Sequence, residues 1–416
     1  MKLSKRLNSM QESPIRKLVP IAEEAKLQGK KVYHLNIGQP DIMTPEVFLK
    51  AIRDFDEEVI KYSFSQGEPK LIESIIDYYK TYDMSFEKDE ILITNGGSEA
   101  LLFALIATCD AGDEVLVPEP FYTNYNGFSL PVGVKVSPIT THAENGFALP
   151  SKDEIQDLIT DKTKAIMLSN PGNPTGVIYT DEEVNRIADL AIENDLYIIA
   201  DEVYREFVYD DFDYTSFGNI DRVKDRVIII DSISKRYSAC GARIGSFASK
   251  NKDLVKGVLK LCQSRLCVPT LEQIGATELY KVDQSYFEDV NTEYKKRRDI
   301  VFDALNSMNG VICKKPHGAF YIIAKLPVED AEDFVIWMLK EFSDNSETVM
   351  FAPAEGFYAT EGLGKDEIRI AYILNEKDLK RSMELLEMGL KEYKNKYIEI
   401  RTSYTKRGSF FTKKKN

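Results

Sequence analysis

Apolar runs that end in polar clusters recur through the middle of the chain. The runs occupy residues 91–94, 114–117, 164–169, 197–200 and 227–230. Short runs rich in β-branched residues and bounded by polar ones predict strands buried on both faces, as in a parallel sheet. Amphipathic stretches between the runs, such as Asp181–Glu193, predict helices. The alternation of strands and helices predicts an α/β fold with a doubly wound, mostly parallel sheet.

A second set of elements flanks this part of the chain. Residues 14–29 predict an amphipathic helix and residues 32–37 a short strand. Residues 317–325 and 367–372 predict strands of a smaller α+β domain, which a helix over residues 378–393 closes. The expected parts are an N-terminal arm with a small-domain segment (1–45), a large domain (46–290), a small C-terminal domain (291–396) and a basic tail (397–416). The tail has no clear apolar period, so we expect disorder or a terminal extension there.

Composition narrows the range of partners. The chain has 416 residues, of which 43% are hydrophobic, and this is enough for a large core in two domains or in one large domain with a satellite. Its formal net charge of −13 argues against nucleic acid as the main partner. No apolar run approaches the length of a membrane span, and the first residues lack the apolar core of a signal peptide. We therefore expect a cytoplasmic protein without a membrane partner.

Cysteine and histidine give no sign of a metal site. The five cysteines are an odd number and form no CxxC pair, so free, reduced thiols are expected. The three histidines have no metal-ligand partner at helical spacing. The sequence therefore predicts chemistry that uses neither a metal nor histidine.

Reactive side chains follow the predicted strands at the point where each strand ends. Lys235 follows the strand at 227–230, and Asp201 and Tyr204 follow the one at 197–200. Asn173 and Tyr122 follow two others. Ligands bind at the carboxyl ends of strands in open α/β sheets. A lysine held there loses its proton more easily than in water and becomes a nucleophilic amine.

The same strand ends also supply an anion site. Its expected members are Gly97 and Ser98 at a strand–glycine–helix junction, with Ser232, Ser234 and Arg243 around Lys235. Free N–H groups and a positive helix end at such a junction attract an anion. The chain has neither the GxxxxGK[ST] pattern of an ATP loop nor a GxGxxG for a dinucleotide, so a single small phosphate is favoured.

Taken together, these groups suit a phosphorylated pyridine aldehyde. A lysine captures the aldehyde, a carboxylate keeps the pyridine nitrogen protonated, and a flat aromatic side chain stacks on the ring.

The chain carries five motifs together, in this order: NPGNPTG (170–176), DEVY (201–204), SISK (232–235), GARIG (241–245) and EIRI (367–370). They resemble those of the class I/II aminotransferases of fold type I, enzymes related to aspartate aminotransferase. The resemblance covers roughly residues 13–395. It implies the cofactor pyridoxal 5'-phosphate, a large domain that binds it and a smaller domain.

The resemblance also implies a role for each site residue. Lys235 is expected to hold the cofactor covalently and to act as the base. Asp201 is expected to pair with the pyridine nitrogen, Asn173 and Tyr204 to bond the phenolic oxygen of the ring, and Tyr122 to stack on it. The residues expected around the phosphate are Gly97, Ser98, Ser232, Ser234 and Arg243.

The resemblance also implies that three further residues contact the substrate or a neighbouring subunit. Arg369 is expected to clamp the substrate's α-carboxylate by a two-pronged contact. Gly38 is expected to lie against the substrate. Tyr62 is expected to reach the phosphate of a neighbouring subunit, which implies a homodimer with shared sites. The segment around Tyr321 is interpreted as structural.

The expected reaction moves an amino group between an L-amino acid and a 2-oxo acid, with 2-oxoglutarate as the acceptor. An aspartate-like donor needs a cation near its distal carboxylate, and the candidates are Arg16, Lys17, Lys70 and Arg265. Aromatic side chains near the site equally favour aromatic or other large neutral donors. A C–S β-lyase on the same fold and a non-catalytic regulator that binds the cofactor remain as alternatives. The acidic charge and the lack of room for a DNA-binding domain argue against the regulator.

Overall fold

A seven-stranded sheet forms the centre of the larger part of the molecule. The computed structural model describes residues 2–412, and side chains as far as residue 395. The strands are β2 (Ile91–Asn95), β3 (Glu114–Glu119), β4 (Lys135–Thr140), β5 (Thr163–Ser169), β6 (Tyr197–Asp201), β7 (Val227–Ser232) and β8 (Ile244–Ala248). Their order is β2-β8-β7-β6-β5-β3-β4, and β8 alone runs against its neighbours. The expected doubly wound, mostly parallel sheet is confirmed.

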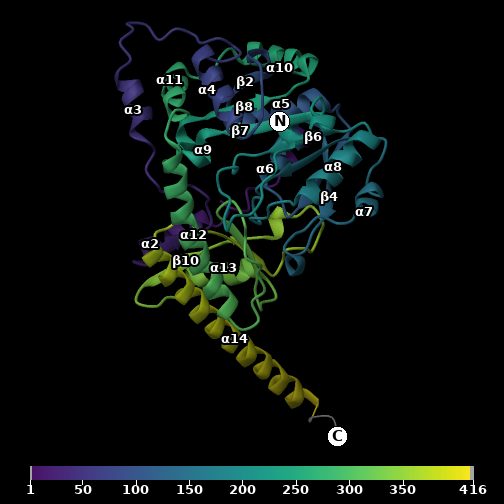
Figure 1. Cartoon of the computed structure of the whole chain (residues 1–416). Coiled ribbons are helices and arrows are strands. Elements are labelled where there is room, and N and C mark those ends of the chain that lie inside the picture. Colours follow the sequence, from purple (N-terminus) through teal and green to yellow (C-terminus); the bar gives the residue numbers. More distant parts are fainter. Residues whose placement is uncertain (1, 413–416) are drawn as a thin grey trace.

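Helices cover both faces of this sheet (Figure 1). They include α4 (Pro69–Lys80), α5 (Gly96–Thr108), α6 (Asn124–Val132), α7 (Lys152–Gln156), α8 (Asp181–Glu193), α10 (Lys252–Arg265) and α11 (Thr270–Leu279). Alternate residues of β7 enter different cores: Ile228 and Ile230 share one with Leu101 and Val258, whereas Ile229 lies in the other with Ile187. The apolar runs of the sequence are therefore continuous because both faces of each strand are buried.

Two small sheets form the other part of the molecule. The strands β11 (Ala352–Pro353), β12 (Glu367–Ala371) and β9 (Tyr321–Lys325) make an antiparallel sheet. Strand β1 (Lys31–His34) pairs in parallel with β10 (Glu347–Met350), so the N-terminal arm joins the C-terminal part of the chain. The helices here are α2 (Val19–Leu27) and α13 (Ala331–Lys340). The expected smaller α+β unit is confirmed, while the exact domain boundaries remain a prediction.

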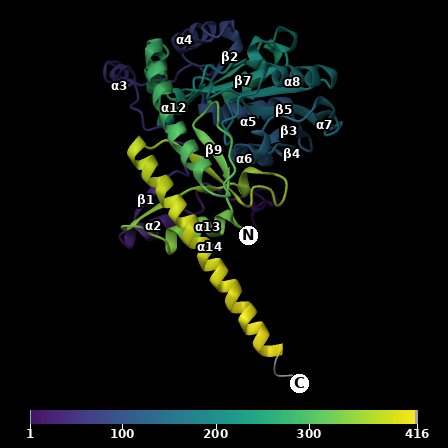
Figure 2. The same ribbon diagram turned by 60° about the horizontal axis from the view of Figure 1, so that its bottom comes forward.

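The helix α12 (Gln284–Ser307) connects the two parts (Figure 2). Its Phe287 belongs to one core of the large sheet, and its Val301 belongs to the core around the small sheets. The two short helices α1 (Lys5–Asn8) and α3 (Glu46–Arg53) lie in the N-terminal segment.

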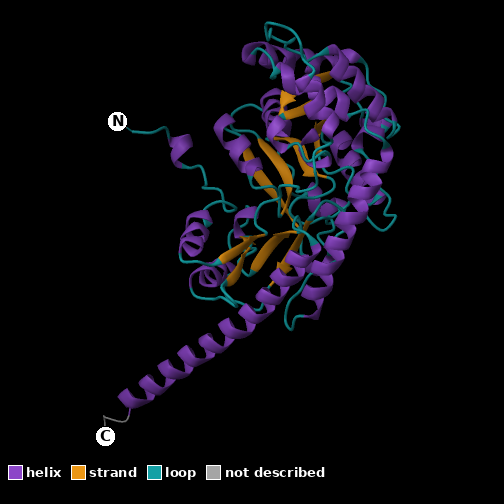
Figure 3. Cartoon of the chain, turned by 90° about the vertical axis from the view of Figure 1, so that its left-hand side faces the viewer, coloured by secondary structure: helices purple, strands orange, loops and turns teal. Residues whose placement is uncertain are grey.

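The last helix, α14 (Glu376–Thr412), is longer than the pattern at residues 378–393 predicts. It extends from the body of the molecule as a single rod (Figure 3). The basic tail thus begins as a terminal extension of this helix, and residues 413–416 lie outside the described part. Within the described residues, no helix has the length and apolar character that a bilayer crossing needs.

Candidate active site

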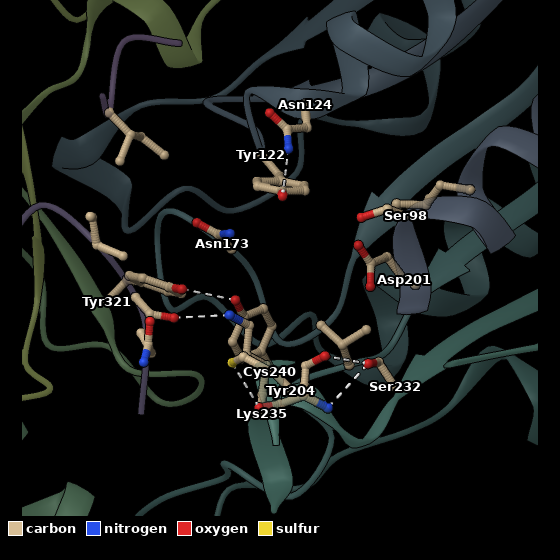
Figure 4. Close-up of a pocket in the computed structure, with 18 of the residues that line it drawn as sticks. Ser98, Tyr122, Asn124, Asn173, Asp201, Tyr204, Ser232, Lys235, Cys240 and Tyr321 are labelled. Carbon is tan, nitrogen blue, oxygen red and sulfur yellow. Dashed lines mark hydrogen bonds between the residues drawn. The ribbon is translucent and has the colours of Figure 1, made fainter. Parts of the chain in front are cut away.

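A cavity of about 550 Å³ lies where the carboxyl ends of the large sheet meet the small sheets. Twelve of the thirteen residues expected at the site line it, and ten of its lining residues are labelled in Figure 4. The twelve are Gly38, Gly97, Ser98, Tyr122, Asn173, Asp201, Tyr204, Ser232, Ser234, Lys235, Arg243 and Arg369. Residues spread over some 330 positions of sequence thus line one cavity. The positions of the strand ends predicted this only for the residues of the large sheet.

Lys235 stands on a one-turn helix, α9 (Ile233–Arg236), directly after β7. The side chain of Ser232 caps this turn by accepting a hydrogen bond from the amide of Ser234 at 3.1 Å. The Ser232 hydroxyl also donates to the carbonyl oxygen of Ile244 at 2.9 Å, which ties the turn to β8. The amine of Lys235 donates to the carbonyl oxygen of Gly38 at 2.9 Å. A rigid turn therefore presents the lysine at the cavity, against the N-terminal arm.

Asp201 is the last residue of β6 and is buried. Its Oδ2 accepts a hydrogen bond from the Tyr125 hydroxyl at 2.9 Å, while its Oδ1 is buried with no partner among the described residues. Burial raises the pKa of Asp201 to about 6, and the hydrogen bond from Tyr125 opposes this rise. A buried oxygen without a partner at the wall of a cavity indicates a ligand that brings a donor or a positive charge.

Tyr204 and Tyr321 meet across the two parts of the molecule. Their hydroxyl oxygens are 2.9 Å apart, and both side chains are buried. Tyr321 belongs to β9 of the small sheets, as expected, and its side chain also lines the cavity. A Cβ atom at Gly38 would overlap the Tyr321 hydroxyl, so only glycine permits this approach of the N-terminal arm.

Arg369 on β12 is 2% exposed and has no carboxylate partner among the described residues. Its guanidinium donates to Asn173 Oδ1 at 3.2 Å and to the Asn36 carbonyl at 2.5 Å, and its Nε has no partner in this part of the chain. The group also lies 4.6 Å from the centre of the Tyr321 ring. Burial lowers the pKa of Arg369. A buried guanidinium of this kind suits a carboxylate ligand, which accepts two parallel hydrogen bonds.

The anion site is built where α5 begins. Gly96 has a φ of +71°, and a Cβ atom there would lie 2.5 Å from a guanidinium nitrogen of Arg243. Arg243 itself has a left-handed backbone, with a φ of +55°, and donates to the Cys240 carbonyl at 3.0 Å. Gly97 and Ser98 follow in the first turn of this 13-residue helix. Backbone amides at a helix start, beside an arginine, fit a phosphate group.

Tyr122 lies on the opposite side of the cavity from Lys235 and Tyr204 (Figure 4). Asn124 donates to its hydroxyl at 2.8 Å, and burial raises the pKa of Tyr122 to about 12. The ring of Tyr125 contacts that of Tyr122 edge-on, with the ring centres 5.6 Å apart. Tyr125 therefore supports both Tyr122 and Asp201. Its spacing of three residues from Tyr122 is the only signal in the sequence for this role.

Tyr62 is the one expected site residue outside the cavity. Its side chain is 82% exposed, and it lines a separate surface hollow with Ile60, Cys267 and Thr270. Its expected contact is with the site of another subunit, so this assignment stays a prediction.

The four candidate cations for a distal carboxylate differ in their positions and partners in the structure. Arg16 lines the cavity, whereas Lys70 does not. Lys17 forms an ion pair with Glu332, and Arg265 forms one with Glu99.

Comparison with known proteins gives the same family throughout. The family model for aminotransferase class I and II matches residues 30–386. Aspartate aminotransferase of Bacillus subtilis is 30% identical over 96% of this chain and 99% of its own. Aromatic-amino-acid aminotransferase 2 of Thermococcus litoralis is 32% identical over 95% of this chain and 100% of its own. The structure of an alanine aminotransferase from Pyrococcus furiosus matches with a TM-score of 0.86 and 32% identity, over 94% of this chain and 100% of its own.

The residues of the cavity fit the cofactor of this family, pyridoxal 5'-phosphate. The unpartnered oxygen of Asp201 suits the protonated pyridine nitrogen, Lys235 suits the aldehyde, and the start of α5 with Arg243 suits the phosphate. The chain is therefore a pyridoxal-phosphate-dependent aminotransferase, and it belongs to the family of class I and II aminotransferases.

Proposed function

We propose that this aminotransferase acts on dicarboxylic substrates, with an aspartate-like amino acid as donor and 2-oxoglutarate as acceptor. The observation that supports this is that the cavity has two arginines besides Arg243, which suits the phosphate. Arg369 is buried at its inner wall, and Arg16 lines it from the segment before α2. The backbone of Arg16 bonds Ser13 and Val19, but its guanidinium forms no ion pair or side-chain hydrogen bond within the part of the chain that the structure describes. Two separate cations match two separate carboxylates, which both the proposed donor and the proposed acceptor carry.

The cofactor and several residues of the cavity have different roles in the proposed reaction. Bound pyridoxal 5'-phosphate supplies an aldehyde that takes the amino group and a ring that accepts electrons. Arg369 binds the α-carboxylate and thereby orients the Cα–H bond of the substrate. The amine of Lys235 then accepts the Cα proton. Asp201, when ionised, would hold the pyridine nitrogen of the bound cofactor in its protonated form. Because Arg369 and Tyr321 come from the small sheets, an approach of the two parts of the molecule excludes water from the cavity.

Kinetics with a panel of amino acids tests this substrate range. The variant Arg16→Met should raise KM for aspartate and 2-oxoglutarate about tenfold, because it removes one charge-assisted contact, and should change kcat/KM for alanine less than twofold. Lys17→Met is the matched control, since Lys17 is the neighbouring cation but pairs with Glu332. Equal losses for aspartate and alanine would contradict the role of Arg16. Release of pyruvate and ammonia from a cysteine-type substrate, without an oxo acid, would indicate the β-lyase instead.

The proposal includes a homodimer with shared active sites. Tyr62 shares its surface hollow with the exposed Ile60 and with Leu271, and an apolar surface of this kind suits a second copy of the chain. By the family resemblance, Tyr62 reaches the phosphate of that copy. Mixing the inactive variants Lys235→Ala and Tyr62→Ala tests this arrangement. Hybrid dimers should regain activity, because one of their two sites is then intact; a mixture without activity would contradict shared sites.

We also propose a cytoplasmic location. All five cysteines are free thiols in the structure, which suits a reducing compartment. Fractionation of cells that express the full chain with a tag tests this location.

A further inference from the structure

Four charged side chains lie behind the strand ends that carry the site. This buried charge cluster consists of Glu202, Arg205, Asp231 and Arg236, each at most 1% exposed. None of them lines the cavity. Each is the sequence neighbour of a residue that does. The neighbouring pairs are Asp201 with Glu202, Tyr204 with Arg205, Ser232 with Asp231, and Lys235 with Arg236.

Ion pairs join the members of the cluster into one unit. Arg205 contacts Glu202 at 2.7 Å and Asp231 at 2.9 Å. Arg236 forms an ion pair with the other carboxylate oxygen of Asp231. Because Asp231 belongs to β7 and Glu202 follows β6, Arg205 ties the ends of these two strands together. Arg236 ties α9 to β7 in the same way.

The surroundings leave the arginines few other partners. The guanidinium of Arg236 lies 4.4 Å from the centre of the Tyr78 ring, and that of Arg205 lies 5.2 Å from the Tyr79 ring. Nε and Nη1 of Arg236 are buried without a hydrogen-bond partner among the described residues. Its position therefore depends on Asp231 and on ring contacts from α4.

We propose that the buried charge cluster is a positioning device that sets where the Lys235 amine and the Asp201 carboxylate stand, and that its arginines keep Asp201 ionised for the cofactor. The proposal rests on the roles given above to Lys235 and Asp201. Glu202, Arg205, Asp231 and Arg236 are positioning residues, since none contacts the cavity.

The electrostatic part of the proposal follows from the charges around Asp201. Glu202 and Asp231 both act to raise the pKa of Asp201, and Tyr125 donates a hydrogen bond that lowers it. The Val203 amide also lowers it, Tyr122 and Tyr204 lie close to Asp201, and Lys235 lines the same cavity. Two arginines balance the charge of the two neighbouring carboxylates. Loss of Arg205 leaves Glu202 without a cation and Asp231 with Arg236 alone, and this excess negative charge disfavours a third ionised carboxylate beside it.

Binding of pyridoxal 5'-phosphate to the cofactor-free protein, measured between pH 5 and 8.5, tests the proposal. Affinity should fall as the pH drops through the range in which Asp201 takes up a proton. The midpoint of this loss should move up by about one pH unit in Arg205→Met. It should move down by about half a unit in Glu202→Gln, which removes a negative charge and keeps the side-chain shape. The two effects should add to a rise of about half a unit in the double variant Glu202→Gln/Arg205→Met.

A control variant separates this effect from general destabilisation. Glu183→Gln changes another buried glutamate, which caps α8 and forms no ion pair with the cluster, and should leave the midpoint within roughly 0.2 unit. Differences between variants also cancel the titration of the cofactor's own phosphate, whose second pKa is near 6. If Arg205→Met fails to fold, Glu202→Gln carries the test alone.

Two results would overturn the proposal, and only one of them would also reject the proposed role of Asp201. Unchanged midpoints in Glu202→Gln and Arg205→Met, with the pH-dependent loss present in the wild type, would reject the cluster alone. Equal binding by the wild type and Asp201→Asn at every pH would reject the role of Asp201 and the cluster with it.

Discussion

The Tyr125 hydroxyl donates a hydrogen bond of 2.9 Å to Oδ2 of Asp201 and leaves Oδ1 of the same carboxylate without a partner among the described residues. One oxygen is thus fixed by the protein, and the other is available to a ligand. Since Tyr125 comes from α6 and Asp201 from β6, the contact also orients the carboxylate relative to the ring of Tyr122.

The variant Tyr125→Phe should weaken the binding of pyridoxal 5'-phosphate three- to tenfold at pH 7.5. It removes the hydrogen bond that favours ionised Asp201 and keeps the ring that contacts Tyr122. Titration of the cofactor-free protein with cofactor measures the effect. Tyr209→Phe is the control, because its hydroxyl is equally buried but bonds the Ala319 carbonyl instead. Equal effects of the two substitutions would show that the contact with Asp201 has no special role.

The stability of the cofactor-free protein should depend on Asp201 with a definite sign. The pKa of this carboxyl is about 6 in the folded chain, above its ordinary value of 3.8. Between these values the folded state binds more protons than the unfolded state, so this group's contribution to stability falls as the pH rises. Asp201→Asn should therefore raise the free energy of unfolding at pH 7.5, by on the order of 1–3 kcal/mol.

The gain from Asp201→Asn should disappear near pH 4, where the carboxyl is protonated in the folded chain. Urea unfolding of both proteins without cofactor, at pH 4 and 7.5, measures the difference. If the wild type is instead more stable than Asp201→Asn at pH 7.5, the ionised carboxylate has a stabilising partner within the protein.

Gly38→Ala should lower kcat/KM at least tenfold with little change in the melting temperature. A Cβ atom at Gly38 overlaps the Tyr321 hydroxyl, so the arm that carries Gly38 must move away from the cavity. The control is Gly241→Ala, at a nearby glycine where a Cβ atom meets no atom within 4 Å. Steady-state kinetics and thermal unfolding of both variants check this. Unchanged kinetics in Gly38→Ala would mean that the arm does not need this contact for the reaction.

The strands of the large sheet and most of the site follow from local sequence patterns. The run at 227–230 is apolar without alternation because both faces of β7 are buried, and Lys235 lies at the cavity because it follows that strand. Helix α2 begins later than the predicted residue 14. Pro20 lacks a backbone N–H and so fits the first turn of a helix better than its interior. Similarly, β9 begins at Tyr321 because Ala319 adopts a φ of +53°.

The remaining site residues depend on contacts between distant segments. Tyr321 and Tyr204 are 117 positions apart, and only the packing of the small sheets against the large one brings their hydroxyls together. The sequence did not predict the buried charge cluster either, because Arg205 and Arg236 stand in stretches whose polar residues are also typical of exposed loops.

The bond between Lys235 and the cofactor is the central claim, and borohydride reduction tests it most directly. Purified protein is mixed with pyridoxal 5'-phosphate, reduced, digested and analysed by mass spectrometry, with Lys235→Ala treated in parallel. We predict one cofactor-derived modification per chain, on Lys235, and none in the variant. An unmodified Lys235, or equal labelling of other lysines in both proteins, would contradict the account.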